Sequence, residues 1–346
     1  MTPKQRIIET VRHNKTDIPA MYIGFSPDWE KKLAKALNVS RNDLHPALGN
    51  DIIPVDIGIN AYMMEDMPEG EVRQSEFGFT YNKIGETFNI VDFPIKSIDD
   101  VADYIHPDPN APGRYDLLDT QVKKFGNDYP ILVDISPVAF EAAYSLMGIE
   151  ETMIALAMEP ETLKHLFEKH VAYTLAVAKH SIDHGTDIIW TGDDWGTQQG
   201  MLISPEMWRS EIKPIINKLW NGIKEYKSDV IIAHHSCGAI APIIPDLVEM
   251  GLDILNPIQP NVPGMDPATL AEKFKRKITF LGGIDTQDLL CNASPDEVEN
   301  SVKNTMATFG TGYILSPAHR IHDVPFANIQ ALFRVAGRDT IEGMVV

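Results

Sequence analysis

Short apolar runs alternate along the chain with longer amphipathic stretches. The stretch 161–184 carries apolar side chains at helical spacing and is followed by Gly185, a residue that commonly ends helices. The next run, 186–190, is short and rich in apolar residues, as in a buried strand. Ser294 stands three residues before Glu297, which predicts a capping box at a helix start. This alternation is typical of βα units.

The same criteria predict eight strands, most of them separated by a helix. They lie at 20–24, 52–55, 131–134, 186–190, 230–233, 254–257, 278–281 and 313–316. Eight is the strand count of a closed (β/α)8 barrel, so we expect an α/β fold with one TIM-barrel domain over 1–346. Two further β-rich runs, 77–81 and 87–91, interrupt the pattern after the second strand. They predict a β-hairpin insertion at 76–93.

The composition is that of an ordinary globular protein, with 44% hydrophobic and 23% charged residues. Lys and Arg number 30 against 49 Asp and Glu, which gives a net charge of −19. An acidic surface repels phosphate backbones and anionic membranes, so neither is expected as a partner. The two cysteines form no disulfide framework, and the sequence has neither a signal-like start nor an apolar run of membrane length. We expect a cytoplasmic protein.

Polar side chains follow most of the predicted strands, on the face where such barrels keep their sites. His235 and Cys237 come directly after 230–233, and a thiolate with an imidazole suits zinc better than magnesium or calcium. A catalytic zinc needs a third protein ligand. The candidates are His319, the pair Asp193 and Asp194, and more distantly His322. The alternative is that Cys237 is an inert buried thiol and His235 a hydrogen-bonded barrel histidine.

Asp193 and Asp194 are adjacent, so they do not both point into the barrel with the same geometry. The carboxylate that faces the site is a candidate catalytic acid or base, a metal ligand, or the group that orients a histidine. Otherwise Asp194 caps a loop or helix. Gln199 and Gln259 are candidates for neutral hydrogen bonds to a substrate, and Met63 is a candidate for an apolar pocket.

A set of motifs spread over nearly the whole chain adds to this picture. The motifs occupy 6–9, 17–19, 192–198, 204–209, 235–238, 253–259, 283–287 and 313–319. In order and spacing they resemble the uroporphyrinogen decarboxylase superfamily, which implies a single (β/α)8 barrel. That superfamily divides into porphyrinogen decarboxylases and zinc-dependent methyltransferases linked to corrinoids.

The decarboxylase branch carries an arginine-rich loop that binds the propionates of the porphyrinogen. The matching stretch here, 24–29, contains no arginine and includes Asp28. In an acidic protein this mismatch disfavours a substrate with many carboxylates. Asp56 does match the pyrrole-binding aspartate of that branch, which leaves a smaller carboxylated substrate as an alternative.

The methyltransferase branch binds zinc through a His-x-Cys motif and a later cysteine. His235 and Cys237 match this motif, and His319 stands in place of the later cysteine. The resemblance implies zinc held by these three residues, with Asp193 or Asp194 as a further group. A neutral imidazole in place of a thiolate makes the zinc more positive and a better Lewis acid. This favours an O-demethylase, in which the methyl group of a methoxylated aromatic compound passes to cob(I)alamin on a partner corrinoid protein.

The same resemblance suggests roles for the remaining residues and leaves other functions open. Phe25, Met63 and Trp195 would shape an apolar pocket, while Gln199 or Gln259 would orient polar substituents of the substrate. A methylcorrinoid:thiol methyltransferase, a decarboxylase, and a non-catalytic barrel that binds a corrinoid partner are the alternatives. A homodimer is compatible with the family, although the sequence identifies no interface.

Overall fold

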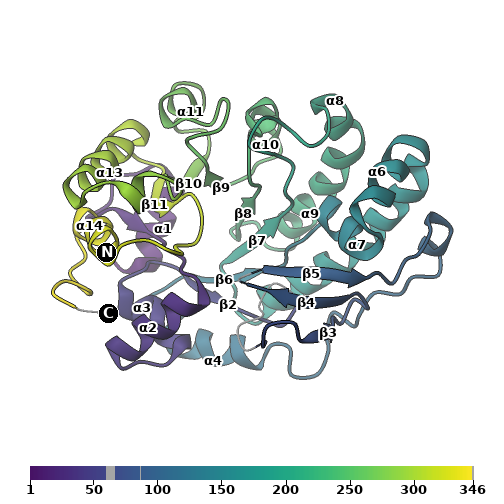
Figure 1. Ribbon diagram of the computed structural model, residues 1–346, viewed down its shortest axis with the longest axis horizontal. Helices are drawn as coiled ribbons and strands as arrows, with labels where there is room; N and C mark the ends of the chain where they lie inside the picture. Colours follow the sequence, from purple (N-terminus) through teal and green to yellow (C-terminus); the bar gives the residue numbers. More distant parts are fainter. Residues whose placement is uncertain (60–66, 86, 345–346) are drawn as a thin grey trace.

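The computed structural model describes residues 1–59, 67–85 and 87–344 (Figure 1). Its centre is a sheet of eight parallel strands that curls into a (β/α)8 barrel, with the order β1-β11-β10-β9-β8-β7-β6-β2. The strands are β1 (Ala20–Met21), β2 (Ile53–Val55), β6 (Ile131–Asp134), β7 (Ile188–Gly192), β8 (Ile231–His235), β9 (Ile254–Ile258), β10 (Thr279–Ile284) and β11 (Tyr313–Pro317). All eight overlap the predicted strands, so the barrel prediction is confirmed.

Helices pack around the outside of this sheet (Figure 1). They are α1 (Pro3–Val11), α2 (Pro27–Leu37), α3 (Leu44–Leu48), α4 (Asp116–Phe125), α5 (Phe140–Met147), α6 (Ile149–Met158), α7 (Pro160–Asp183), α8 (Pro205–Met207), α9 (Lys213–Tyr226), α10 (Ile244–Glu249), α11 (Pro267–Phe274), α12 (Leu289–Asn292), α13 (Pro295–Phe309) and α14 (Phe326–Val335). The predicted capping box is present, because Ser294 and Glu297 cap α13 reciprocally. No helix in the described ranges is long and apolar enough to cross a membrane.

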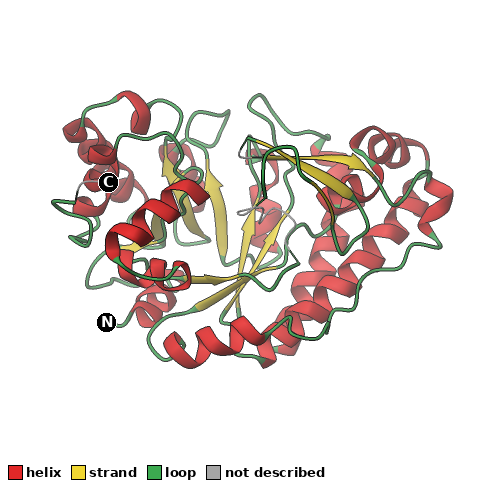
Figure 2. Cartoon of the chain, turned by 60° about the horizontal axis from the view of Figure 1, so that its bottom comes forward, coloured by secondary structure: helices red, strands yellow, loops and turns green. Residues whose placement is uncertain are grey.

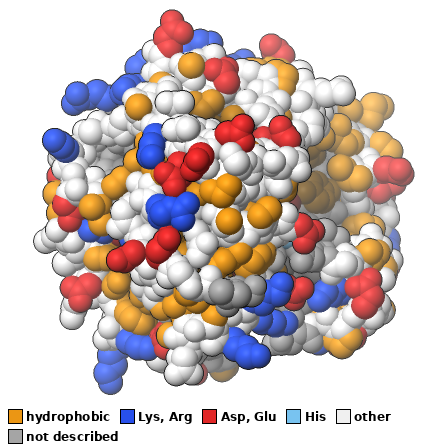
Figure 3. Space-filling model, turned by 60° about the vertical axis from the view of Figure 1, so that its left-hand side comes forward, with side chains coloured by type: hydrophobic (Ala, Val, Ile, Leu, Met, Phe, Trp, Pro, Cys, Tyr) orange, Lys and Arg blue, Asp and Glu red, His pale blue; other side chains and the backbone are white. Residues whose placement is uncertain are grey.

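Two hydrophobic cores lie on the two faces of the barrel sheet. The larger core fills the space between the strands and the surrounding helices. The smaller one fills the barrel interior with residues such as Ile188 and Ile254, and Ile7 of α1 joins it. Because side chains alternate between the faces of a strand, each barrel strand contributes to both cores. Charged side chains of both signs are mixed over the face shown in Figure 3, so this face presents no basic stripe.

A small antiparallel sheet follows β2 and lies beside α5 and α7 (Figure 2). It consists of β3 (Val72–Gln74), β4 (Thr80–Ile84) and β5 (Thr87–Asp92), with β4 in the middle. β4 begins later than the strand we predicted at 77–81, because Gly78 donates to the Ser75 carbonyl in a tight turn with φ of +92°. β3 was not predicted, since its three side chains are all exposed and give no apolar alternation.

Side chains join the two edge strands of the barrel, β1 and β2, which form no ladder with each other in the described residues. Asp51 donates its backbone N–H to the Met21 carbonyl and accepts the Met21 N–H on Oδ2, both at 2.8 Å. The Asn50 amide accepts from the Ile23 N–H and donates to the Ile23 carbonyl, both at 2.9 Å. Two consecutive residues thus supply hydrogen bonds in place of a β1–β2 ladder and close the barrel.

The Asp51 carboxylate also binds two guanidinium groups. Arg6 of α1 donates to Oδ1, and Arg338, which follows α14, donates to Oδ2 at 3.0 Å. The Asp51 side chain is 1% exposed, so these charges meet away from solvent. One carboxylate therefore ties the first helix and the C-terminal segment to the barrel seam.

We expect Asp51→Asn to lower the free energy of unfolding by about 3–5 kcal/mol, because it leaves Arg338 without its charge partner and Arg6 with only the more exposed Asp17. Asp17→Asn is the control. Asp17 also pairs with Arg6, but its side chain is 39% exposed, and such pairs contribute at most about 1 kcal/mol. Urea unfolding followed by circular dichroism compares the two variants, and equal losses would contradict a special role for the seam.

Candidate metal centre

Several side chains enter the barrel mouth because inward positions on a strand recur every second residue. Five residues stand two positions after a residue of the barrel-interior core. Their side chains face the same way as that residue does, but nearer the C-terminal end of the sheet. They are Tyr22 just after β1, Asp134 of β6, Trp190 of β7, His235 of β8 and Asn256 of β9. His234 has the opposite parity, is fully buried on the outer face and stacks on Trp195.

The loop that carries Cys237 interlocks with the loop after β7. Gly238 has φ of +81°, and a Cβ there would lie 2.4 Å from the carbonyl carbon of Gly196, so the turn requires glycine. Ala239 donates to the Thr197 carbonyl at 2.9 Å across the same contact. This close approach places the residues that follow β7 next to those that follow β8.

Asp194, His235 and Cys237 meet at this contact, with one ligand atom from each within 4.8 Å of the others. His235 Nε2 lies 3.3 Å from Cys237 Sγ and 3.7 Å from Asp194 Oδ1. A tetrahedral zinc ion with bonds of about 2.0–2.3 Å separates its ligand atoms by roughly 3.4–3.6 Å. The donor set of one sulfur, one nitrogen and one oxygen therefore fits zinc in both chemistry and spacing.

Neighbouring groups hold His235 in the orientation that a metal ligand needs. Its Nδ1 lies 2.7 Å from the Asn256 amide oxygen, and Asn256 in turn donates to the Leu281 carbonyl at 3.2 Å. Since that amide oxygen only accepts, Nδ1 carries the proton and Nε2 is directed at Cys237. Burial lowers the pKa of His235, but the Cys237 sulfur and the Asp194 charge outweigh it and raise the pKa to about 10. In the absence of a metal these contacts favour the charged form of His235.

Asp193 has a different function from its neighbour. It is fully buried and accepts the backbone N–H groups of Ala139, Phe140 and Glu141, at 3.3, 2.8 and 2.9 Å. Burial, followed by the Glu141 charge, raises the pKa of Asp193 to about 7. Both oxygens are used at the N-terminus of α5, where the Asp193 side chain has a positioning role, and the catalytic role expected for it stays a prediction. Asp194 is the carboxylate that faces the site, and its Oδ1 also accepts the Cys237 N–H at 2.7 Å.

His319 does not join the group of Asp194, His235 and Cys237. It is exposed after β11, and its ring stacks on His322 with centroids 5.8 Å apart. Partial burial and then the charge of His235 lower the pKa of His319, so the two histidines share the barrel mouth. Asp194, and not His319, is the third side chain beside His235 and Cys237 in this structure, because the loop interlock brings that carboxylate closer.

Two aromatic residues predicted for a substrate pocket belong to the core instead. Trp195 is fully buried, and its ring packs edge-on against Trp208 with centroids 5.1 Å apart. Phe25 is 1% exposed and packs against Phe333 of α14. Both side chains face the surrounding helices, so neither lines the barrel mouth in this structure.

The remaining predicted substrate residues have varied positions. Gln259 accepts the Gly238 N–H and so supports the Cys237 turn, while Gln199 is exposed. Asp56 is exposed after β2, and its carboxylate accepts the Gly58 N–H at 2.7 Å. Met63 lies outside the described residues.

Sequence reasoning missed the aromatic residues that do face the mouth. The Tyr22 and Trp190 rings lie 6.5 Å apart, and the Trp190 and His235 rings 6.2 Å apart, so the three form a row across the barrel. Glu141 was also missed, and its Oε2 accepts the Asp194 N–H at 3.2 Å. Strand parity was the signal that could have found the two aromatic residues, by counting two from Ala20 and Ile188.

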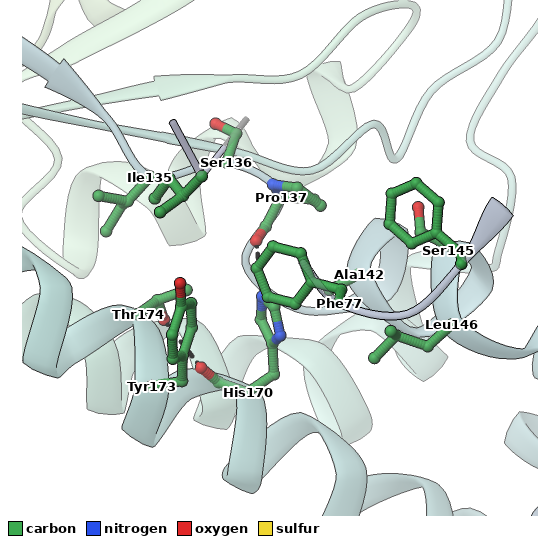
Figure 4. Close-up of a pocket in the computed structure, with 12 residues that line it drawn as sticks. Phe77, Ile135, Ser136, Pro137, Ala142, Ser145, Leu146, His170, Tyr173 and Thr174 are labelled. Carbon is green, nitrogen blue, oxygen red and sulfur yellow. Dashed lines mark hydrogen bonds between the residues drawn. The ribbon is translucent and has the colours of Figure 1, made fainter. Parts of the chain in front are cut away.

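A separate apolar pocket lies between the inserted sheet and helices α5 and α7 (Figure 4). Phe77 covers it from one side, and His170 lies below, where its Nε2 donates to the Pro137 carbonyl at 2.9 Å. His170 Nδ1 lies 3.0 Å from His106 Nε2. Burial lowers the pKa values to about 4 for His170 and about 3 for His106, so both stay neutral. Because their nitrogens serve internal hydrogen bonds, we assign no chemistry to this pocket.

Comparisons with solved structures agree with the barrel. A methyltransferase from Methanosarcina mazei superposes with a TM-score of 0.72 at 15% identity, over 97% of this chain and 98% of that one. A B12-independent methionine synthase from Shewanella sp. W3-18-1 has a TM-score of 0.49 at 12% identity, covering 90% and 86%. A putative vitamin-B12-independent methionine synthase from Listeria monocytogenes has a TM-score of 0.47 at 11% identity, covering 94% and 96%. At these identities the first likeness establishes the fold.

A search of curated protein sequences gives no match to the chain. The family model described as uroporphyrinogen decarboxylase (URO-D) matches residues 75–338. This range contains the three candidate metal ligands and barrel strands β6 to β11. The chain therefore belongs to the uroporphyrinogen decarboxylase family.

Proposed function

We propose that the chain is a zinc-dependent methyltransferase. It would move a methyl group from an O-methyl donor, a methoxylated aromatic compound, to the cobalt of a corrinoid on a partner protein. The observation that carries this proposal is the group Asp194, His235 and Cys237 at the barrel mouth. The fold shared with a methyltransferase supports it.

The reaction divides between the metal and the residues of the chain. Zinc, held by Asp194, His235 and Cys237, would supply Lewis-acid polarisation of the ether oxygen. The methyl–oxygen bond breaks, a cobalt–carbon bond forms with the electron pair of cob(I)alamin, and the phenolate takes a proton from water. Asn256 keeps the imidazole of His235 oriented, and the interlocked loops keep Cys237 against Asp194.

With Asp194 in place of His319 as a ligand, the argument for an ether donor rests on a different charge at the zinc site. With His319 as a ligand the site would hold one anionic ligand, whereas Asp194 adds a second and balances the charge of a zinc ion. A carboxylate is a harder and weaker electron donor than the second thiolate expected in the family, so the metal stays a good Lewis acid. The row of Tyr22, Trp190 and His235 adds flat ring surfaces that suit an aromatic donor.

A decarboxylase is the second candidate, because Asp56 is exposed at the end of β2. The segment 24–29 lacks the arginines that bind a polycarboxylate, and the net charge is −19. A smaller carboxylated substrate and a metal-independent reaction would then be required. The two candidates differ in whether Cys237 or Asp56 is essential.

We expect purified protein to contain about one zinc ion per chain and Cys237→Ser to lose it on dialysis against a competing chelator. Cys291→Ser is the matched control, because Cys291 is not part of the candidate ligand group. It lies in α12, where its Sγ contacts the Thr286 carbonyl at 3.2 Å. Elemental analysis compares the three proteins. Equal zinc in both variants, or none in the wild type, would contradict the proposed site.

We expect Asn256→Ala to weaken zinc affinity roughly 10–100-fold, because it removes the oxygen that orients His235. Competition with a chromophoric chelator measures this change. An unchanged affinity would show that the Asn256 contact does not support a metal ligand.

We expect the zinc-loaded protein to consume cob(I)alamin in the presence of a methoxylated aromatic compound. The change in corrinoid absorbance measures the rate of this reaction. Cys237→Ser should reduce this rate at least about 100-fold, since removing a group that stabilises developing charge has effects of that size. Asp56→Asn should keep the rate within a few-fold. The reverse pattern, with loss of carbon dioxide from a carboxylated pyrrole, would favour the decarboxylase.

A further inference from the structure

Arg320 is an arginine at the barrel mouth without a visible partner. It follows His319 after β11 and its side chain is exposed. Among the described residues its guanidinium has no hydrogen bond and no ion pair, whereas Arg6, Arg114 and Arg338 all bind carboxylates. Arg320 thus brings an unpaired positive charge to the mouth of a chain whose net charge is −19.

The backbone around Arg320 is fixed by pairing beyond the ends of β1 and β11. Ile321 donates to the Gly24 carbonyl at 3.0 Å, and Ser26 donates to the Ile321 carbonyl at 2.8 Å. Phe25 and Ile321 form a parallel bridge. Arg320 is therefore held beside Gly24 by regular hydrogen bonds.

The side chain of Arg320 lies on the inner side of this extension. A Cβ on Gly24 would lie 3.5 Å from Arg320 Cγ, so the arginine stem covers the side to which Gly24 points. Gly24 is two residues after Tyr22, which packs against the interior core. Because strand positions two apart share a face, the stem of Arg320 lies above the Tyr22 ring.

The charge of Arg320 reaches across the mouth. Asp134 is the last residue of β6 on the other side of the mouth. Burial raises the pKa of Asp134, and the positive charge of Arg320 acts in the opposite direction and lowers it. Tyr22, Trp190 and His235 form the row of rings between the Arg320 side and the metal centre. A flat ring lying on this row would have one edge near His235 and the other near Arg320.

We propose that Arg320 binds a carboxylate on the aromatic methyl donor, so that the donor is a methoxylated benzoate. This inference rests on the proposed function and names its substrate class. The carboxylate accepts hydrogen bonds from the guanidinium at one end of the ring, and the methoxy oxygen lies toward Asp194, His235 and Cys237 at the other. The alternative role for Arg320 is a counter-charge that offsets Asp134 in the empty mouth.

Matched ligands separate these two roles. A methoxybenzoate and the corresponding methoxybenzamide have nearly the same shape and differ in charge. Binding is measured by calorimetry on zinc-loaded protein without corrinoid, for the wild type, Arg320→Gln and Arg320→Lys. Arg12→Gln is the control, since Arg12 lies in the N-terminal segment with a side chain that is 67% exposed.

We expect Arg320→Gln to weaken methoxybenzoate binding about tenfold or more and to leave methoxybenzamide binding unchanged. Arg320→Lys should restore part of the affinity, because it keeps the charge and loses the bidentate geometry. Arg12→Gln should bind both ligands as the wild type does. Equal weakening of both ligands in Arg320→Gln, or no weakening of either, would overturn the proposal.

The experiment also separates this inference from the proposed function. Selective loss of methoxybenzoate binding without any methyl transfer to cob(I)alamin would refute the methyltransferase and keep the carboxylate site. Methyl transfer with unchanged selectivity in Arg320→Gln would refute the carboxylate site and keep the methyltransferase.

Discussion

The buried carboxylate of Asp51 is the constraint on which the geometry of the mouth depends. Asp51 and Asn50 bind the backbone of Met21 and Ile23, the residues on either side of Tyr22. With both neighbours fixed, Tyr22 has to face the barrel interior, where its ring meets Trp190. The hydrogen bonds that close the barrel thus fix Tyr22 at one end of the row of rings. His235, a residue of the candidate metal centre, forms the other end.

The candidate metal centre brings several acidic side chains close together. Hydrogen bonds from neighbouring groups keep these side chains in place. Asp194 and Cys237 approach the same imidazole, and the Cys237 N–H donates to Asp194. Glu141 adds a further carboxylate beside Asp194, and burial followed by the Asp194 charge raises the pKa of Glu141. A divalent cation bound there would offset the charge of these acidic side chains, so their closeness supports a metal site independently of the His-x-Cys spacing.

The sequence was sufficient for the barrel strands and for two of the three candidate ligands, because these depend on local signals. Apolar runs locate the strands, and His235 and Cys237 share one turn. Asp194 could not be chosen over His319 from spacing, since its position depends on the contact between Gly196 and Gly238 across two loops. Trp195 follows the strand and is buried away from the mouth, whereas Trp190 lies inside the strand and has the parity that faces the mouth. Tertiary contacts and side-chain parity account for these differences.

The adjacency of Asp193 and Asp194 has a mechanical consequence. Asp193 holds the first N–H groups of α5, and the carbonyl of Leu146 near the end of that helix accepts from Ile95, just beyond β5. A single peptide unit therefore separates Asp194, a candidate metal ligand, from the residue that holds the start of α5, and the far end of that helix bonds the segment just beyond β5. The two neighbouring aspartates thus connect Asp194 to the inserted sheet through one helix of eight residues.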